Sequence, residues 1–463
     1  MTFSKNNTIF EPFKIKMVEP IPILNLEERR AVLEKAHYNL FCIPSKHVTF
    51  DLLTDSGTSA MSSKQWAGIM LGDESYAGSD SFFHFADTIK GITGMEDIIP
   101  THQGRSAETL LAKALLKPGM HVVGNTQFDT TKANIESVGC LSVDLPSAES
   151  DDSQAEFPFK GNVNLESLSN YLEMHHKKIP FFIMTVTNNS IGGQPVPMEN
   201  IKDTRTLLSR YSIPLFLDAA RFAENAYFIK TREAGYADLS VRAIAKEMFG
   251  LADGVLMSAK KDAFANIGGF LATRNPKLAE QIRQLMVITE GFPTYGGLSG
   301  RDLEAVAIGI EEILDENYLQ YRQRSVEYFG RGLEKAGFKV VKPFGGHAVY
   351  IDAGASLSHI PVKYYPAQTL SIALYEYIGL RSVEVGSIMF GHRDENGEEH
   401  FAQKELVRLA MPRRVYTQSH VDYMIEEAVG CFPVLREQPG YEITHQAKHL
   451  RHFTAKFAKV NCY

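Results

Sequence analysis

The sequence predicts an α/β protein, in which a large domain with a mostly parallel sheet flanked by helices is followed by a smaller α+β domain. Between about residues 95 and 275, short apolar runs alternate with amphipathic stretches. Strands that alternate with helices favour a parallel sheet with both faces covered. After about residue 310 the pattern starts again, which indicates the second domain. A length of 463 residues agrees with more than one domain, because a single core stops growing at roughly 250–300 residues.

In the first part of the chain, each predicted strand is an apolar run that ends in polar residues. Ligands of parallel sheets bind at the carboxyl ends of the strands, so the residues that follow each run are candidates for a site. Helices are predicted over 106–116 and 198–211. The predicted strands cover 121–125, 181–187, 213–221, 254–261 and 267–273.

The second part of the chain opens with a long predicted helix over 301–336. The charged segment "GHRDENGEEHFAQ" (391–403) is interpreted as a solvated loop. Further apolar runs are at 338–343, 347–354, 381–388 and 406–412, and helices are predicted over 367–380 and 419–432. The predicted domains are an N-terminal arm with part of the small domain (1–50), the large domain (51–310) and the small C-terminal domain (311–463).

Composition excludes several classes of protein. A net charge of −7 argues against a nucleic-acid binder, which usually carries a basic face. The longest apolar run, 179–186, is far shorter than the roughly 20 residues that cross a bilayer, and the N-terminus shows no secretory apolar region. Four cysteines without a CxxC pair indicate reduced thiols, so a cytoplasmic protein is expected. They are Cys42, Cys140, Cys431 and Cys462.

The run 254–261 ends in two adjacent lysines, Lys260 and Lys261. A buried lysine is costly unless its charge is paired or used. A lysine held beside cations in a desolvated site has a lowered pKa and becomes a nucleophile for carbonyl groups. The pair therefore points to a covalent site at the end of this strand.

Two other strand ends supply groups that suit such a site. Gly104 and Arg105 begin a predicted helix, whose free N–H groups and dipole favour a phosphate. Within the run 213–221, Asp218 ends the apolar strand, either as the partner of Arg221 three residues later or facing a protonated ring nitrogen of a ligand. A phosphate seat, an aspartate and a lysine match the needs of pyridoxal phosphate, which forms a Schiff base with lysine.

Several longer motifs strengthen this interpretation. The sequence closely resembles the β-eliminating lyases, a family of fold-type I (aspartate aminotransferase-like) pyridoxal phosphate enzymes, almost from end to end. Members cleave L-tryptophan to indole or L-tyrosine to phenol, in each case with pyruvate and ammonia. The resemblance implies a potassium ion and a homotetramer built as a dimer of catalytic dimers. It is carried by "FDLLTDSGTSAMS", "GDESYAGS", "PTHQGR", "GGQPV", "DAARFAENAYFIK", "MSAKKD", "GGHAVYIDAG" and "LRHFTAKF".

The resemblance also implies roles for individual residues. Lys261 would be the Schiff-base lysine, with Lys260 beside it as a second cation. The phosphate would be held by Gln103, Gly104, Arg105 and Ser258, the ring by Phe128, and the ring oxygen by Asn189 and Arg221. The substrate would be bound by Arg408 at its carboxylate, and by Thr54, Ser56 and Asn189. The potassium ligands would be Gly57, Glu74 and Asn266.

Three positions that separate the two substrates, Asp129, Val385 and His452, follow the pattern of the tryptophan-cleaving members. Asp129 can accept a hydrogen bond from an indole N–H, and Val385 lacks the donor that a phenolic oxygen would require. Asp129 as a helix N-cap and His452 as a histidine satisfied within the fold are simpler alternatives. Tyr76, by default a turn or core tyrosine, would donate a proton to the leaving group from a neighbouring subunit.

The expected activity is therefore the β-elimination of L-tryptophan to indole, pyruvate and ammonia. Cleavage of L-tyrosine and a pyridoxal phosphate transaminase are the alternatives among enzymes. A non-catalytic phosphate-binding α/β protein is the alternative outside enzymes, and it would require neither Lys261 nor Asp218.

Overall fold

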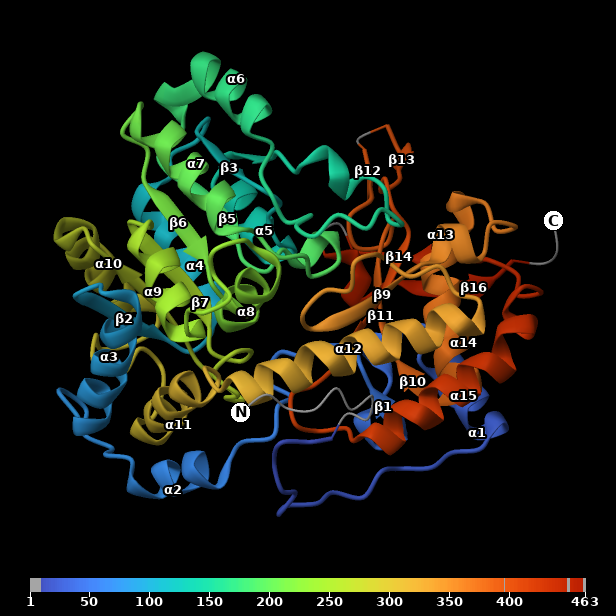
Figure 1. Cartoon of the computed structure of the whole chain (residues 1–463). Helices are drawn as coiled ribbons and strands as arrows, with labels where there is room; N and C mark the ends of the chain where they lie inside the picture. The colour runs from blue at the N-terminus through green and yellow to red at the C-terminus, as the bar shows by residue number, and fades with distance from the viewer. Residues whose placement is uncertain (1–9, 395, 448–449, 461–463) are drawn as a thin grey trace. The chain divides into compact units, whose positions relative to one another are not determined.

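The computed structural model describes residues 10–394, 396–447 and 450–460 (Figure 1). The chain forms two compact units. Unit 1 comprises Met1–Asp55, Gln323–Pro412 and Tyr416–Tyr463, and unit 2 comprises Ser56–Arg322 and Arg413–Val415. Residues 51–55 thus lie in unit 1 and residues 311–322 in unit 2, whereas the predicted domain boundaries are 50/51 and 310/311.

Unit 2 is built on a seven-stranded sheet with the order β2-β8-β7-β6-β5-β3-β4. Among these seven strands, β8 runs in the direction opposite to the other six, so the predicted mostly parallel sheet is confirmed. The strands are β2 (Asp97–Thr101), β3 (His121–Gly124), β4 (Leu141–Asp144), β5 (Phe182–Thr185), β6 (Leu215–Asp218), β7 (Gly254–Ser258) and β8 (Gly269–Thr273).

Helices of unit 2 pack against this sheet. Leu110 of α4 and Ile282 of α10 share one apolar core with Phe181 and Leu256 of the sheet region. The helices are α2 (Ser63–Leu71), α3 (Asp80–Thr93), α4 (Gly104–Leu115), α5 (Asp129–Ser137), α6 (Leu165–His175), α7 (Met198–Ser209), α8 (Phe222–Arg232), α9 (Val241–Gly250), α10 (Pro276–Thr289) and α11 (Gly300–Glu312).

Unit 1 has a three-stranded antiparallel sheet with the order β11-β14-β9 and three smaller two-stranded pairs. Its strands are β1 (Phe50–Asp51), β9 (Ala348–Asp352), β10 (Leu380–Arg381), β11 (Val383–Val385), β12 (His392–Arg393), β13 (Glu399–His400), β14 (Leu406–Ala410), β15 (Tyr441–His445) and β16 (Lys456–Lys459). Its helices are α1 (Leu26–Lys35), α13 (Ala353–Ser356), α14 (Pro366–Ile378) and α15 (Gln418–Leu435), and α12 (Glu316–Ala336) belongs to both units.

Short 3₁₀ helices complete the described chain. They are η1 (Leu40–Cys42), η2 (Ser45–His47), η3 (Ala148–Ser150), η4 (His176–Lys178), η5 (Asn189–Ile191), η6 (Val362–Tyr364) and η7 (Arg451–Phe453).

Three elements differ from the sequence-based expectations. The single helix predicted over 301–336 is wrong, because α11 ends at Glu312 and α12 begins at Glu316. At the break, Asp315 Oδ1 accepts a hydrogen bond from the Asn317 N–H at 3.0 Å, a local bond that competes with a continuous helix. The run 338–343 forms no strand and makes only an isolated bridge from Val340 to Ile351. The segment expected as a solvated loop forms the β12–β13 hairpin.

Two further expectations concern the membrane and the cysteines. Among the described residues, no helix has both the length and the apolar character needed to cross a bilayer. Cys42, Cys140 and Cys431 are free thiols, and Cys462 lies outside the described residues.

Candidate active site

A cavity of about 700 Å³, open to solvent, lies in unit 2 at the carboxyl ends of the parallel strands. Strand β6 ends at Asp218 and β7 at Ser258, and both residues line the cavity. The eleven predicted site residues that line it are Ser56, Gln103, Gly104, Arg105, Phe128, Asn189, Asp218, Arg221, Ser258, Lys260 and Lys261. The structure therefore brings together all the residues predicted to bind pyridoxal phosphate.

The N-terminus of α4 forms one wall of this cavity. A Cβ atom on Gly104 would lie 2.7 Å from Ser258 Cβ, so only glycine lets the helix begin so close to the end of β7. The N-cap residue, Gln103, makes no side-chain capping hydrogen bond with any described residue. First-turn N–H groups without a cap, with Arg105 beside them, suit a phosphate group.

Asp218, the last residue of β6, and Lys261, three residues after the end of the adjacent strand β7, line the same cavity. Burial raises the pKa of Asp218, and the charges of Lys261 and Arg221 oppose that rise. A carboxylate in this position gains from a further cationic partner, such as a protonated pyridine nitrogen. Burial, followed by the charge of Arg105, lowers the pKa of Lys260. The residues present therefore fit pyridoxal phosphate.

The position of Lys261 is fixed by its neighbours in the chain. Asp262 is fully buried, and its Oδ2 accepts a hydrogen bond from the Ala223 N–H at the start of α8 at 2.8 Å. Its Oδ1 lies 2.9 Å from Arg413 Nη2. The Lys261 carbonyl accepts a hydrogen bond from the Phe264 N–H at 3.0 Å. The lysine is thus carried by a segment anchored immediately after it.

Glu108 also lines the cavity, and it is not among the site residues predicted from the sequence. Its Oε2 accepts a hydrogen bond from Thr130 Oγ1 at 3.1 Å, which links α4 to the start of α5 just after Phe128. Burial, followed by the charge of Asp218, raises the pKa of Glu108 to about 7. Its spacing of four residues from Gly104 places both on one helix face, which is the signal that could have identified it.

Asp129 and Tyr76 lie outside the set of residues that line this cavity. Asp129 is the first residue of α5, Phe128 is the N-cap, and the Thr130 N–H donates to Asp129 Oδ1 at 2.6 Å. Tyr76 is 70% exposed and packs against Phe292 and Tyr295 with ring centroids 5.4 Å apart in each case. A hydrogen bond with Tyr295 raises the pKa of Tyr76.

The predicted potassium ligands lie in two places. Asn266 Nδ2 donates to the Gly57 carbonyl at 3.1 Å, so these two residues are neighbours. The Glu74 carboxylate instead lies at the start of α11, where it is 3.0 Å from Arg301 Nε and 3.4 Å from the Gly300 N–H.

Unit 1 holds the remaining predicted residues. Arg408 lies on β14 and donates from Nη2 to the Leu53 carbonyl, next to Thr54, at 3.2 Å. Val385 ends β11, and His452 lies in η7; both are buried. Burial, followed by the charge of Arg408, lowers the pKa of His452 to about 4, so its imidazole is neutral at physiological pH.

Comparison with known proteins identifies relatives along almost the whole chain. The family model described as "Beta-eliminating lyase" matches residues 51–427. A tryptophanase of Salinibacter ruber is 54% identical over 97% of this chain and 95% of that protein. A tryptophanase of Rhodobacter capsulatus is 53% identical over 98% of this chain and 100% of that protein. A tyrosine phenol-lyase of Pasteurella multocida is 47% identical over 96% of this chain and 98% of that protein.

Solved structures share the fold at much lower identity. One, described as "high resolution structure of SPT with PLP internal aldimine", has a TM-score of 0.55 and 12% identity over 83% of this chain and 87% of that one. A SepCysS–SepCysE N-terminal domain complex has a TM-score of 0.53 and 14% identity over 89% of this chain and 100% of that one. The fold is that of the fold-type I enzymes, as predicted. The family model and the relatives above 50% identity show that the protein is an enzyme, a carbon–carbon lyase. The chain belongs to the β-eliminating lyase family.

Proposed function

We propose that this enzyme uses pyridoxal phosphate to convert L-tryptophan and water to indole, pyruvate and ammonia. The observation that carries the proposal is the cavity that Lys261, Asp218 and the N-terminus of α4 line together. Lys261 supplies the amine that the cofactor requires, Asp218 the carboxylate for its ring nitrogen, and the N-terminus of α4 the binding site for its phosphate. Relatives that are 51–54% identical are named tryptophanase, which supports the choice of substrate.

Pyridoxal phosphate, when bound, supplies an aldehyde that bonds to amines and a protonated ring that accepts electrons from the substrate. The first-turn N–H groups of α4, with Arg105 and Ser258, would hold its phosphate. Phe128 would stack on the ring, and Asn189 and Arg221 would bind the ring oxygen. Asp218 would favour a protonated ring nitrogen, because a buried carboxylate is stabilised by a cationic partner.

The other groups would act on the substrate. Lys261 Nζ takes the proton from the tryptophan α-carbon. Arg408 binds the substrate carboxylate through a fork of donors that suits a planar anion. Tyr76, supplied by a neighbouring subunit, protonates C3 of the indole, since indole is a poor leaving group until that carbon is protonated. Asp129 and His452 stabilise the indole cation that results.

Cleavage of L-tyrosine to phenol is the second candidate. It is favoured by relatives named tyrosine phenol-lyase, one of which is 47% identical to this chain. Against it, Asp129 suits the indole N–H, and Val385 offers no side-chain donor to a phenolic oxygen. A site built around a required hydrogen bond can reject an analogue that lacks it by roughly 10⁴–10⁵.

We further propose a potassium ion with Gly57, Glu74 and Asn266 as its candidate ligands, a homotetramer built from catalytic dimers, and a cytoplasmic location. Gly57 and Asn266 are neighbours, whereas Glu74 contacts the start of α11. The oxygens of these three residues are the hard ligands that an alkali cation prefers. Replacing potassium with sodium in the assay tests the ion, and light scattering in solution tests the assembly.

The decisive experiment incubates the purified protein with pyridoxal phosphate, potassium and either L-tryptophan or L-tyrosine. Indole and phenol are separated by chromatography, and pyruvate is measured by its reduction with lactate dehydrogenase. Release of indole and pyruvate in equal amounts, well above phenol, is expected. Predominant release of phenol would establish the second candidate, and a lack of pyruvate from both substrates would overturn the proposal.

A further inference from the structure

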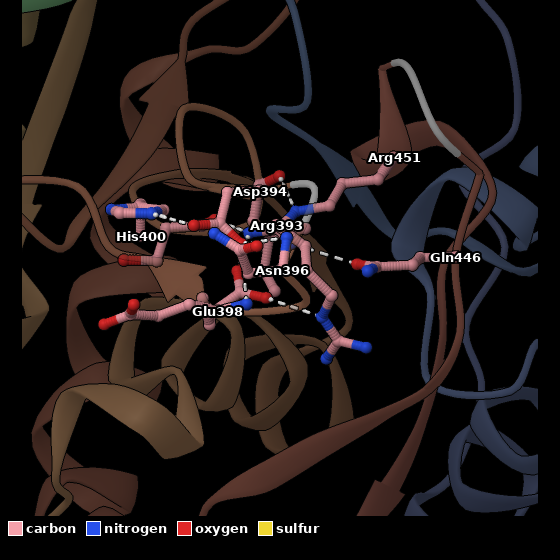
Figure 2. A network of polar contacts seen from close by, with 10 residues as sticks. Arg393, Asp394, Asn396, Glu398, His400, Gln446 and Arg451 are labelled. Atoms are coloured by element: carbon pink, nitrogen blue, oxygen red, sulfur yellow. Dashed lines mark hydrogen bonds and ion pairs between the residues drawn. The ribbon is translucent and has the colours of Figure 1, made fainter.

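Arg451 immediately precedes His452, and its guanidinium is buried in unit 1. Its Nε donates to the Ile388 carbonyl at 3.1 Å and its Nη2 to the Ser387 carbonyl at 2.5 Å. Its Nη1 donates to Gln446 Oε1 at 3.0 Å (Figure 2). One side chain thus ties the segment that carries His452 to the loop that follows β11.

That loop begins directly after Val385, the last residue of β11. Its backbone is held from both sides by buried carboxylates. The Ile388 N–H donates to Glu384 Oε1 at 2.9 Å, and the Ser387 N–H donates to Glu405 Oε1 at 2.9 Å. The carbonyls that receive Arg451 therefore keep a fixed position relative to Val385.

Glu399 of β13 supplies the counter-charge to Arg451. Its Oε1 lies 2.6 Å from Arg451 Nη2, and the two side chains are only 14% and 6% exposed. Breaking a buried ion pair of this kind costs far more than breaking an exposed one, because a buried charge is left uncompensated. A second cation, Arg393, reaches Glu399 Oε2 at 3.5 Å but is itself half exposed.

The β12–β13 hairpin fixes Glu399 by its own turn. Asp394 Oδ1 accepts hydrogen bonds from the Asn396 and Glu398 N–H groups at 2.9 and 2.8 Å (Figure 2). Asp394 Oδ2 lies 3.2 Å from His400 Nε2 across the hairpin. At Gly391, just before the hairpin, a Cβ atom would lie 2.9 Å from Arg451 Nη2. Glycine at this position therefore leaves room for the guanidinium.

His452 makes further contacts of its own within unit 1. Its carbonyl accepts a hydrogen bond from Asn39 Nδ2 at 3.2 Å, and its ring contacts Phe41 at a centroid distance of 5.8 Å. Arg451 is the adjacent residue and contacts three other segments, so its side chain forms a direct polar link between η7 and the loop after β11.

We propose that Arg451, paired with Glu399, is a positioning residue that sets substrate selectivity by holding His452 in a fixed relation to Val385. This inference rests on the proposed function, in which both positions discriminate between aromatic leaving groups. Loss of the guanidinium fork lets η7 shift relative to β11, which spoils the fit of the aromatic ring. A displacement of about 1 Å can cost roughly 100-fold in rate. Substrates with a small leaving group do not depend on this fit.

The test compares kcat/KM for L-tryptophan with kcat/KM for S-methyl-L-cysteine, which eliminates to methanethiol, pyruvate and ammonia. Arg451→Lys keeps the charge but loses the planar fork, and it is expected to lower the ratio of the two values about tenfold or more. Glu399→Gln is expected to lower the ratio in the same direction by a smaller factor. Arg393→Gln is the matched control, with a change below about twofold.

A double-mutant cycle separates positioning from general stability. On a His452→Ala background, Arg451→Lys is expected to change the ratio by less than about twofold, because the residue through which it acts is gone. An equal loss for both substrates, or the same change with and without His452, would overturn the inference. So would a His452→Ala variant with an unchanged ratio, or failure of both Arg451→Lys and Glu399→Gln to fold.

Failure of the proposed function gives a different result. In that case the wild-type enzyme releases phenol from L-tyrosine in place of indole from L-tryptophan. The same ratio measured with L-tyrosine then still tests Arg451.

Discussion

Arg413 Nη2 lies 2.9 Å from Asp262 Oδ1, and neither side chain is exposed to solvent. The same nitrogen is 2.8 Å from Glu224 Oε1, which Arg322 Nε also approaches at 3.2 Å. Two guanidinium groups thus balance two carboxylates inside unit 2, one of which, Asp262, is next to Lys261 in the chain. Burial raises the pKa of Asp262 to about 7, and Arg413 is the strongest group that opposes this rise.

Arg413→Met is expected to destabilise the enzyme by about 3 kcal/mol or more, because two buried carboxylates lose a partner. Thermal unfolding with and without the cofactor measures the effect. Arg331→Met is the matched control, since its pair with Glu327 on α12 is exposed and such pairs contribute about 1 kcal/mol or less. Equal melting temperatures for the two variants would contradict the prediction.

Lys261→Ala is expected to lower kcat about a thousandfold or more and to remove the covalent attachment of the cofactor. Borohydride reduction followed by peptide mass spectrometry locates the attachment. Lys260→Ala is the control and should keep the attachment at position 261. A labelled peptide that carries the modification at Lys260 would reverse the assignment of the two lysines.

Glu108→Gln is expected to flatten the pH dependence of stability in the cofactor-free enzyme. The folded pKa of Glu108 is about 7, above its ordinary value of 4.5, so the folded state binds this proton more tightly than the unfolded chain does. Wild-type stability therefore falls as the pH rises from about 5 to 8, by up to roughly 3 kcal/mol. Melting temperatures across that range measure the difference, with Glu136→Gln, an exposed change on α5, as the control. Parallel curves for wild type and Glu108→Gln would refute this account.

His452→Gln is expected to make the enzyme more resistant to mild acid. The folded pKa of His452 is about 4, below its ordinary value of 6.5, so the unfolded chain binds the proton more tightly. Wild-type stability is therefore lost as the pH falls from about 6.5 toward 4, again by up to roughly 3 kcal/mol. Urea unfolding at pH 7 and pH 5 measures the loss, and the exposed His445→Gln provides the control. The prediction is wrong if the urea midpoint of His452→Gln falls as much between pH 7 and pH 5 as the urea midpoint of the wild type does.

Much of unit 2 was predictable because its strands are short apolar runs with polar residues at their carboxyl ends. Asp218 and Lys261 were identified as a pair from that rule, and the structure places both against one cavity. The rule works since parallel strands bring residues far apart in sequence to the same edge of the sheet.

The rest depends on contacts that a local pattern does not contain. At the break between α11 and α12, Asp315 accepts a side-chain hydrogen bond from the Asn317 N–H, within a region whose apolar spacing continues. Segment 391–403 has the composition of a solvated loop, yet Glu399 within it pairs with Arg451, more than fifty residues further along the chain. In the sequence, Glu108 looks like an ordinary glutamate on a helix, and only the fold places it close enough to Asp218 for the two charges to interact. The last two features arise from tertiary partners, which override composition and propensity, whereas the helix break involves a local polar bond that apolar spacing does not reveal.

The return of Arg413–Val415 to unit 2 limits how this enzyme can be recombined with its relatives. A chimaera with one crossover between residues 322 and 413 takes Glu224 and Asp262 from one parent and their guanidinium partner from the other. Parents that differ at any of these three positions yield hybrids with mismatched charge in the interior. Exchange of the larger unit as a cassette therefore requires that the short stretch at 413–415 be exchanged with it.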